Sequence, residues 1–126
     1  MTFNIRYNNK NDGENAWDNR KEELAGLINY YHPDLLGLQE VLPEQLNYLS
    51  RNLFGYSVVA LGREPNNQGE AVPIFYNTNK YELFENKTFW LSETPDSVST
   101  GWDASLPRIC TYAILKIEQH NKNSIF

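Results

Sequence analysis

Residues 34–40 read Asp-Leu-Leu-Gly-Leu-Gln-Glu, a short apolar run that follows a helix-like segment and stops on the carboxylate of Glu40. A second run with strand character, residues 2–7, precedes that helix and carries the polar residues Asn4 and Arg6. In an α/β protein, ligands bind in the crevice beyond the carboxyl ends of the strands. The order of strand, helix and strand therefore predicts that Glu40 and the end of the first run share the rim of a pocket.

Two amphipathic helices are expected in the first half of the chain. The first covers residues 19–31, with Asp18 as its N-cap and Pro33 after its end. The second begins at Pro43, because proline is favoured in a first helical turn, and ends before Gly55. Each presents one apolar face at spacings of three and four. These faces are Leu24, Leu27, Ile28 and Tyr31 in the first helix, and Leu46, Leu49 and Leu53 in the second.

Strands dominate the remainder of the chain. Since strand follows strand without an intervening helix, antiparallel pairing is expected, with residues 77–80 as a tight hairpin turn. Residues 92–107 form a polar loop that contains Trp102 and is too long for an ordinary connection, and loops of that length often carry function. The expected strands are residues 56–61, 71–76, 81–91 and 109–117, and a further strand is expected to begin at Ile125.

Composition limits the classes of function. The 126 residues, 40% apolar and 13% aromatic, suffice for one soluble core. A net charge of −5 and a pI near 5.0 give no overall basic footprint for a nucleic-acid backbone, although a local basic patch remains compatible with them. A small phosphorylated substrate, or a metal between protein and phosphate, fits this charge balance better.

Cys110 is the only cysteine, which excludes an intrachain disulfide and a cysteine zinc cluster. Its neighbours predict a small buried strand residue. No stretch reaches the length of a membrane span, and the N-terminus lacks the basic and apolar regions of a signal peptide. The compartment stays open between the cytoplasm and export after removal of an upstream leader, because Met1 directly precedes an expected core strand.

Four pieces of the sequence follow one another along the whole chain. They are Phe3-Asn4-Ile5-Arg6, Leu38-Gln39-Glu40-Val41, Leu61-Gly62-Arg63 with Gly69-Glu70-Ala71-Val72-Pro73-Ile74-Phe75-Tyr76, and Gly101-Trp102-Asp103 with Leu106-Pro107-Arg108-Ile109. Together these pieces resemble the endonuclease/exonuclease/phosphatase superfamily. The resemblance is strongest to a bacterial branch similar to the nocturnin-type and carbon-catabolite-repressor-type nucleases. Pancreatic deoxyribonuclease, sphingomyelinases, inositol polyphosphate phosphatases and abasic-site endonucleases are more distant members.

The resemblance implies an α/β fold of four layers, α/β/β/α, with two mostly antiparallel sheets. It implies hydrolysis of a phosphoester with a divalent cation, usually Mg²⁺ and alternatively Mn²⁺. Residues 1–126 would be the N-terminal half of one such domain, with the C-terminal half as the missing partner. The family's histidine, G-D-x-N and S-D-H motifs are not found in this sequence.

By the same resemblance, Glu40 is the metal ligand, and a single carboxylate suits a hard cation that keeps several waters. Asn4 matches the asparagine beside the metal. Glu70 matches the acidic residue that hydrogen-bonds the catalytic histidine and fixes its tautomer. Arg108 matches the arginine that binds the scissile phosphate.

Weaker candidates for substrate binding are Arg6, Arg63 and Trp102, the last because aromatic faces stack on bases or sugars. Core packing is the better interpretation of Trp90. His32 and His120 are expected at the surface. The alternatives to an enzyme are a phosphate-binding module that lacks part of the catalytic machinery and a module that recruits a partner through an exposed sheet edge. The substrate stays open among nucleic acids and small phosphoesters.

Overall fold

The computed structural model describes residues 1–118, so His120 and the strand expected at Ile125 lie outside the described residues. Its main element is a mixed four-stranded sheet in the order β1-β2-β6-β3. Strands β1 (Thr2–Asn4) and β2 (Leu35–Gln39) run parallel, whereas β6 (Ile74–Asn77) lies antiparallel to both β2 and β3 (Tyr56–Val59). The expected α/β class with mostly antiparallel pairing is confirmed.

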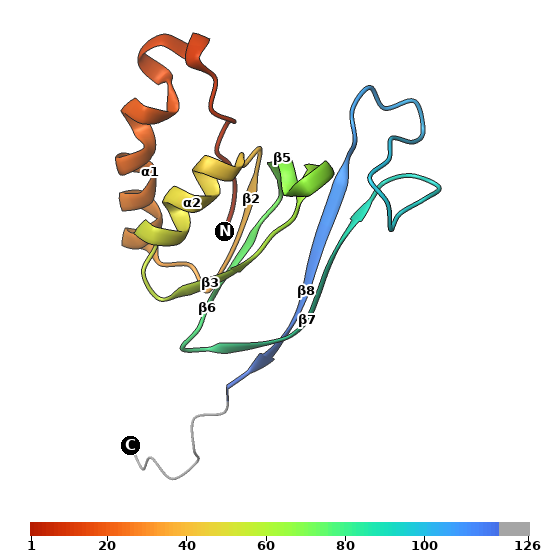
Figure 1. Cartoon of the computed structure of the whole chain (residues 1–126). Helices are drawn as coiled ribbons and strands as arrows, with labels where there is room; N and C mark the ends of the chain where they lie inside the picture. The colour runs from red at the N-terminus through yellow and green to blue at the C-terminus, as the bar shows by residue number, and fades with distance from the viewer. Residues whose placement is uncertain (119–126) are drawn as a thin grey trace.

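Two helices, α1 (Trp17–Tyr31) and α2 (Pro43–Asn52), lie on one side of this sheet (Figure 1). Two antiparallel hairpins complete the described chain. One pairs β4 (Gly62–Glu64) with β5 (Gln68–Ala71), and the other pairs β7 (Tyr81–Trp90) with β8 (Ile109–Ile117). The long β7–β8 hairpin lies on the side of the sheet opposite the helices (Figure 1). Two short 3-10 segments, η1 (Lys10–Asn15) and η2 (Pro65–Asn67), are part of the connections.

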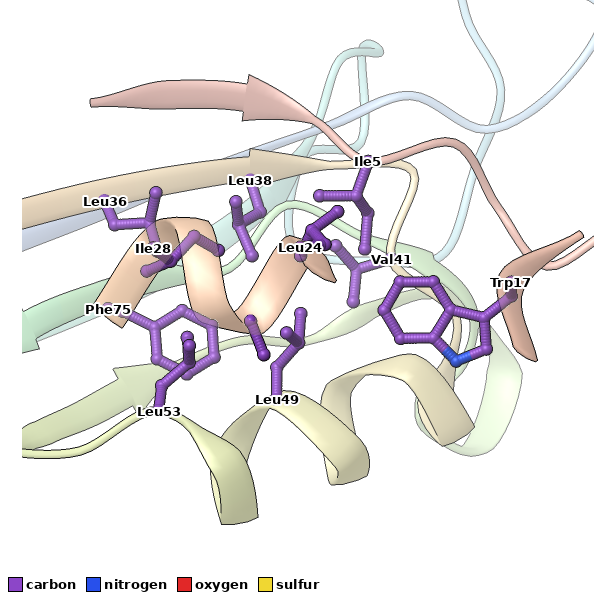
Figure 2. Packing of buried hydrophobic residues seen from close by; sticks show 11 residues of the cluster. Ile5, Trp17, Leu24, Ile28, Leu36, Leu38, Val41, Leu49, Leu53 and Phe75 are labelled. Carbon is purple, nitrogen blue, oxygen red and sulfur yellow. The ribbon is translucent and has the colours of Figure 1, made fainter. Parts of the chain in front are cut away.

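The core lies between the sheet and the two helices, where apolar side chains of both layers interdigitate (Figure 2). Helix α1 buries a narrower stripe than the spacing predicts. Leu24 and Ile28 are buried, but Leu27 is 44% exposed and Tyr31, the last residue of the helix, is 63% exposed. The core cluster is Ile5, Trp17, Leu24, Ala25, Ile28, Leu36, Leu38, Val41, Leu49, Leu53 and Phe75.

The start of α1 differs from the expectation. The N-cap is Ala16, without a side-chain hydrogen bond, and Asp18 lies in the first turn, where it accepts a hydrogen bond from Lys21 at 2.9 Å. The reason is that Trp17 joins the helix, because its indole is buried against the ring of Tyr48 with centroids 5.8 Å apart. Asp18 therefore acts as a first-turn carboxylate near the positive end of the helix dipole and does not cap the helix.

The turn at residues 77–80 is present but does not form the expected hairpin. Strand β6 pairs with β2 and β3, whereas β7 pairs with β8, so the turn connects two different sheets. Asn77 is 5% exposed, and its side-chain oxygen accepts from the N–H of Asn79. The local turn chemistry was predicted correctly, but the pairing of the flanking strands depends on tertiary packing, which a turn sequence does not encode.

The expectation for Cys110 is wrong. Cys110 lies on β8, as predicted, but it is exposed. Within residues 1–118, strand β8 pairs only with β7, and no second layer covers the face of the hairpin that carries Cys110. By contrast, Trp90 is 6% exposed, and its indole N–H donates to the carbonyl of Arg63 at 2.9 Å. This bond joins the β7–β8 hairpin to the β4–β5 hairpin. None of the helices in the described part of the chain is long and apolar enough to cross a membrane.

Candidate active site

The two parallel strands β1 and β2 bring Asn4 and Glu40 together at their carboxyl ends. Their register pairs Asn4 with Gln39, so Glu40 follows one residue later. The Asn4 amide nitrogen donates to Glu40 Oε1 at 3.0 Å, and the backbone N–H of Tyr7 donates to Glu40 Oε2 at 3.2 Å. The predicted adjacency of the two strand ends is confirmed.

Both strand ends turn through a left-handed backbone conformation at a residue other than glycine. Arg6 has φ 61° and Glu40 has φ 60°. Such conformations are unfavourable for residues with a Cβ and concentrate at functional sites, where surrounding contacts maintain them. At Arg6 one such contact is a hydrogen bond from its own backbone N–H to Asn4 Oδ1, at 3.0 Å.

Glu70 reaches the same region through β5. An isolated bridge pairs Val41 with Ala71. The distance from Val41 N to Ala71 O is 3.2 Å, and that from Ala71 N to Val41 O is 2.8 Å. The residue before Ala71 is Glu70, and its Oε2 lies 2.6 Å from Arg63 Nη1 on the neighbouring strand. Both side chains are mostly buried, at 13% exposure for Arg63 and 20% for Glu70.

Arg108 approaches from the other hairpin, directly before β8. Its carbonyl accepts from the N–H of Leu91 at 2.8 Å, which fixes the end of the long loop formed by residues 92–107. Arg108 is exposed and forms no ion pair within the described residues. A guanidinium in this state is able to bind an anion without first breaking an internal contact.

These side chains surround two adjoining cavities of about 730 and 380 Å³. Glu40, Arg63, Glu70 and Arg108 line both, and Asn4 lines the smaller one. The larger cavity also has two further carboxylates, Glu44 and Glu64. The structure therefore gathers five of the seven candidate residues, from two strand ends and two hairpins, around one space.

Arg6 and Trp102 are not among the residues that line these cavities. The Arg6 guanidinium forms a two-point contact with Asp12 at 3.0 and 3.1 Å and stacks over the ring of Tyr7. This contact raises the pKa of Arg6 and lowers that of Asp12. Trp102 lies in the long loop and is 68% exposed. Trp17 belongs to the core.

The donor set at the strand ends fits a hard cation that retains most of its waters. Each Glu40 oxygen accepts one hydrogen bond, from Asn4 or from Tyr7, which leaves lone pairs for a metal. Within residues 1–118, no group of three or more histidine, cysteine, aspartate or glutamate side chains could enclose a metal by itself. The described residues thus offer an anchor for a hydrated cation and not a closed cage.

The sequence of residues 1–117 matches the model of the endonuclease/exonuclease/phosphatase family. The chain belongs to this family. Members of the endonuclease/exonuclease/phosphatase family hydrolyse phosphoesters, generally with divalent metals. The family assignment and the α/β fold expected from the sequence are both confirmed.

Several solved structures of this family share the fold closely. A family member from Bacteroides vulgatus is 43% identical, with a TM-score of 0.88 over 92% of this chain and 45% of that one. A mannosyl-6-phosphatase from Bacteroides thetaiotaomicron is 39% identical, with a TM-score of 0.87 over 92% of this chain and 45% of that one. An uncharacterised protein of Acanthamoeba polyphaga mimivirus is 32% identical in an alignment 116 residues long, which covers 86% of this chain and 42% of that protein. This chain therefore spans less than half the length of these relatives.

Two residues that support the candidate site were not found from the sequence. Gln45 is fully buried and Arg20 is half-buried, and both bind the backbone of residues 5–8, which follows Asn4. A signal for Gln45 exists, since it stands at the third position of a helix where a glutamine side chain commonly binds back to the N-cap. No comparable local pattern marks Arg20, whose acceptors are carbonyls of Ile5, Arg6 and Asn15.

Proposed function

We propose that this chain contributes the metal-anchoring part of a phosphoester hydrolase that depends on a divalent cation, Mg²⁺ or Mn²⁺. The observation that carries the proposal is the contact of Asn4 with Glu40 at the ends of two parallel strands, at the edge of a cavity that also contains Arg108. Membership of a family of phosphoester hydrolases supports it.

In this proposal Glu40 holds the cation, which when bound supplies positive charge to a phosphoryl oxygen. Asn4 orients the Glu40 carboxylate through its amide nitrogen. Arg108 binds the phosphate, because a guanidinium can donate to two phosphate oxygens at once. Glu70 fixes Arg63 at the wall of both cavities, in addition to the contact with a catalytic histidine that the family resemblance implies for it. Arg6 and Trp102 remain proposed substrate contacts that would require a substrate extending beyond the two cavities.

We further propose that residues 1–126 are the N-terminal half of one domain. The chain contains no G-D-x-N or S-D-H motif and spans less than half of its relatives, so the remaining catalytic groups would come from further residues of the same domain. Without them the chain would be a phosphate-binding or interaction module, which is the alternative function.

The test is a phosphoesterase panel on the full-length protein with Mg²⁺ and with Mn²⁺. The panel includes a sugar 6-phosphate, because one relative is a mannosyl-6-phosphatase, together with a short RNA and a small phosphodiester. Glu40→Gln removes the anchoring charge while keeping the side-chain size. Glu44→Gln is the matched control, because Glu44 lines the same larger cavity and its loss changes the net charge equally.

We expect Glu40→Gln to lower kcat/KM by more than about a hundredfold, since even residues that only support metal ligands contribute ten- to a hundredfold. Glu44→Gln should stay within a few-fold of the wild type. Equal losses in both variants would contradict the role of Glu40. A wild type that binds Mn²⁺ but hydrolyses nothing in the panel would favour the phosphate-binding alternative.

A further inference from the structure

Gln45 makes three hydrogen bonds from a side chain that is fully buried. Its Oε1 accepts from the backbone N–H of Leu42 and from that of Asn8, both at 3.1 Å. Its Nε2 donates to the carbonyl of Arg6 at 2.9 Å. One side chain on α2 thus joins the segment that follows β2 to the segment that follows β1.

Capping of α2 explains only one of these bonds. A glutamine at the third helical position binds the N–H of the N-cap residue, here Leu42, and that bond alone would satisfy the helix end. The other two bonds go to Arg6 and Asn8, which are 39 and 37 residues away in the sequence. They use the remaining hydrogen-bond acceptor and donor groups of the Gln45 amide to bind a segment outside the helix.

The segment that Gln45 binds is the one that directs its own N–H groups toward the candidate metal anchor. Between the two residues bound by Gln45 lies Tyr7, whose N–H donates to Glu40 Oε2. The N–H of Arg6 donates to Asn4 Oδ1, which fixes the amide that donates to Glu40 Oε1. Both hydrogen bonds to the Glu40 carboxylate therefore depend on the conformation of residues 6–8.

That conformation requires support because Arg6 has φ 61°. Its carbonyl has two donors, Gln45 Nε2 at 2.9 Å and Arg20 Nη2 at 3.0 Å. Arg20 also donates to the carbonyl of Ile5 at 2.6 Å. A left-handed residue with a Cβ persists only where such contacts hold it in place.

We propose that Gln45 is a positioning residue for the metal anchor: it holds the left-handed turn at Arg6, and through Tyr7 and Asn4 it fixes the orientation of the Glu40 carboxylate. The inference rests on the proposed function in one respect, namely that Glu40 binds a divalent cation. Groups that orient metal ligands in this way typically change metal affinity by about ten- to a hundredfold.

The test uses Gln45→Met in the full-length protein, because methionine keeps the length of the side chain and removes all three hydrogen bonds. Asn29→Leu is the matched control. Asn29 also joins two segments by backbone hydrogen bonds, donating to Asn52 O at 2.8 Å and accepting from Phe54 N at 3.1 Å, but neither of these partners belongs to the site. Two quantities are measured for each variant: Mn²⁺ affinity by electron paramagnetic resonance, and backbone hydrogen exchange in residues 5–8.

We expect Gln45→Met to weaken Mn²⁺ binding by about tenfold or more. It should also accelerate exchange at residues 6–8 by on the order of tenfold, because their N–H groups lose a fixed geometry. Asn29→Leu should lower the melting temperature without changing either quantity. Unchanged Mn²⁺ affinity in Gln45→Met would overturn the proposal, as would an equal loss of affinity in Asn29→Leu.

A second variant covers the case in which Gln45→Met does not fold. Gln45→Glu keeps an acceptor for the N–H groups of Leu42 and Asn8, replaces the donation to Arg6 O by a repulsive contact between two oxygens, and adds one negative charge. It should accelerate exchange at Arg6 and Tyr7 and weaken Mn²⁺ binding, and wild-type values of both would overturn the proposal. If the wild type itself does not bind Mn²⁺, the proposed function fails, and the exchange measurement still decides whether Gln45 fixes the turn.

Discussion

Replacing Glu70 by alanine removes the partner of a guanidinium that is mostly buried. Arg63 Nη1 lies 2.6 Å from Glu70 Oε2, with side-chain exposures of only 13% and 20%. The Nε atom of Arg63 is also buried and has no hydrogen-bond partner within residues 1–118. In Glu70→Ala, the positive charge of Arg63 would thus lose its ion pair while its access to water stays restricted.

The size of the effect follows from this burial. Exposed ion pairs contribute about 0–1 kcal/mol, whereas removing one partner of a buried pair costs about 3–5 kcal/mol. Because Arg63 and Glu70 retain some contact with water, we expect Glu70→Ala to lower the free energy of unfolding by about 2–4 kcal/mol. The double variant Arg63→Met with Glu70→Leu leaves no unpaired charge, and such replacements are often close to neutral.

The assay is urea unfolding of the full-length protein, with the wild type, the variants Glu70→Ala, Glu70→Leu and Arg63→Met, and the double variant Arg63→Met with Glu70→Leu. The last three, with the wild type, form a double-mutant cycle. We expect a coupling energy of about 2 kcal/mol that changes little between 0.15 and 1 M salt, because buried pairs are screened less than exposed ones. A coupling below about 0.5 kcal/mol would refute the reasoning, since it is the value of a surface pair.

Two further predictions concern stability away from the cavity. Phe75 is 1% exposed in the core of the sheet, so Phe75→Ala should lower the free energy of unfolding by about 3–5 kcal/mol in urea titrations; a loss below about 1 kcal/mol would contradict this packing. Asp34 has a pKa below its usual value of 3.8 because Lys80 donates a hydrogen bond to its carboxylate. The ion pair therefore stabilises the fold above pH 3.8, and this stabilisation is lost as the pH falls through the lowered pKa. Melting temperatures of Asp34→Asn and the wild type should therefore differ at pH 7 and converge in strong acid, and a constant difference would exclude this origin.

The neighbourhood of Asn4 and Glu40 was predictable because it depends on local patterns that agree with one another. Each residue follows a short apolar run, and the helix between the runs sets the two strands parallel and adjacent. The convergence of Glu70 and Arg108 on the same cavity was available only through the family resemblance. It depends on the bridge between Val41 and Ala71 and on the pairing of β7 with β8, neither of which the local sequence specifies.

The incorrect predictions have a common physical origin in tertiary packing. Residues 77–80 have the composition of a hairpin turn, but β6 is already paired on both sides and leaves no edge for β7. Cys110 has the neighbours of a core residue, but the described residues place no second layer over its face of β8. Gln45 was overlooked for the opposite reason, because a capping position conceals contacts with a segment that is distant in sequence.

The left-handed conformations at Arg6 and Glu40 have a consequence for protein engineering. A left-handed backbone costs a residue with a Cβ about 1–2 kcal/mol relative to glycine. A search that rewards thermal stability alone would therefore select glycine at both positions, and at position 40 it would delete the carboxylate. Stabilising libraries for this chain should keep Arg6 and Glu40 fixed, and enrichment of glycine at either position would measure how much stability the protein gives up to keep these side chains.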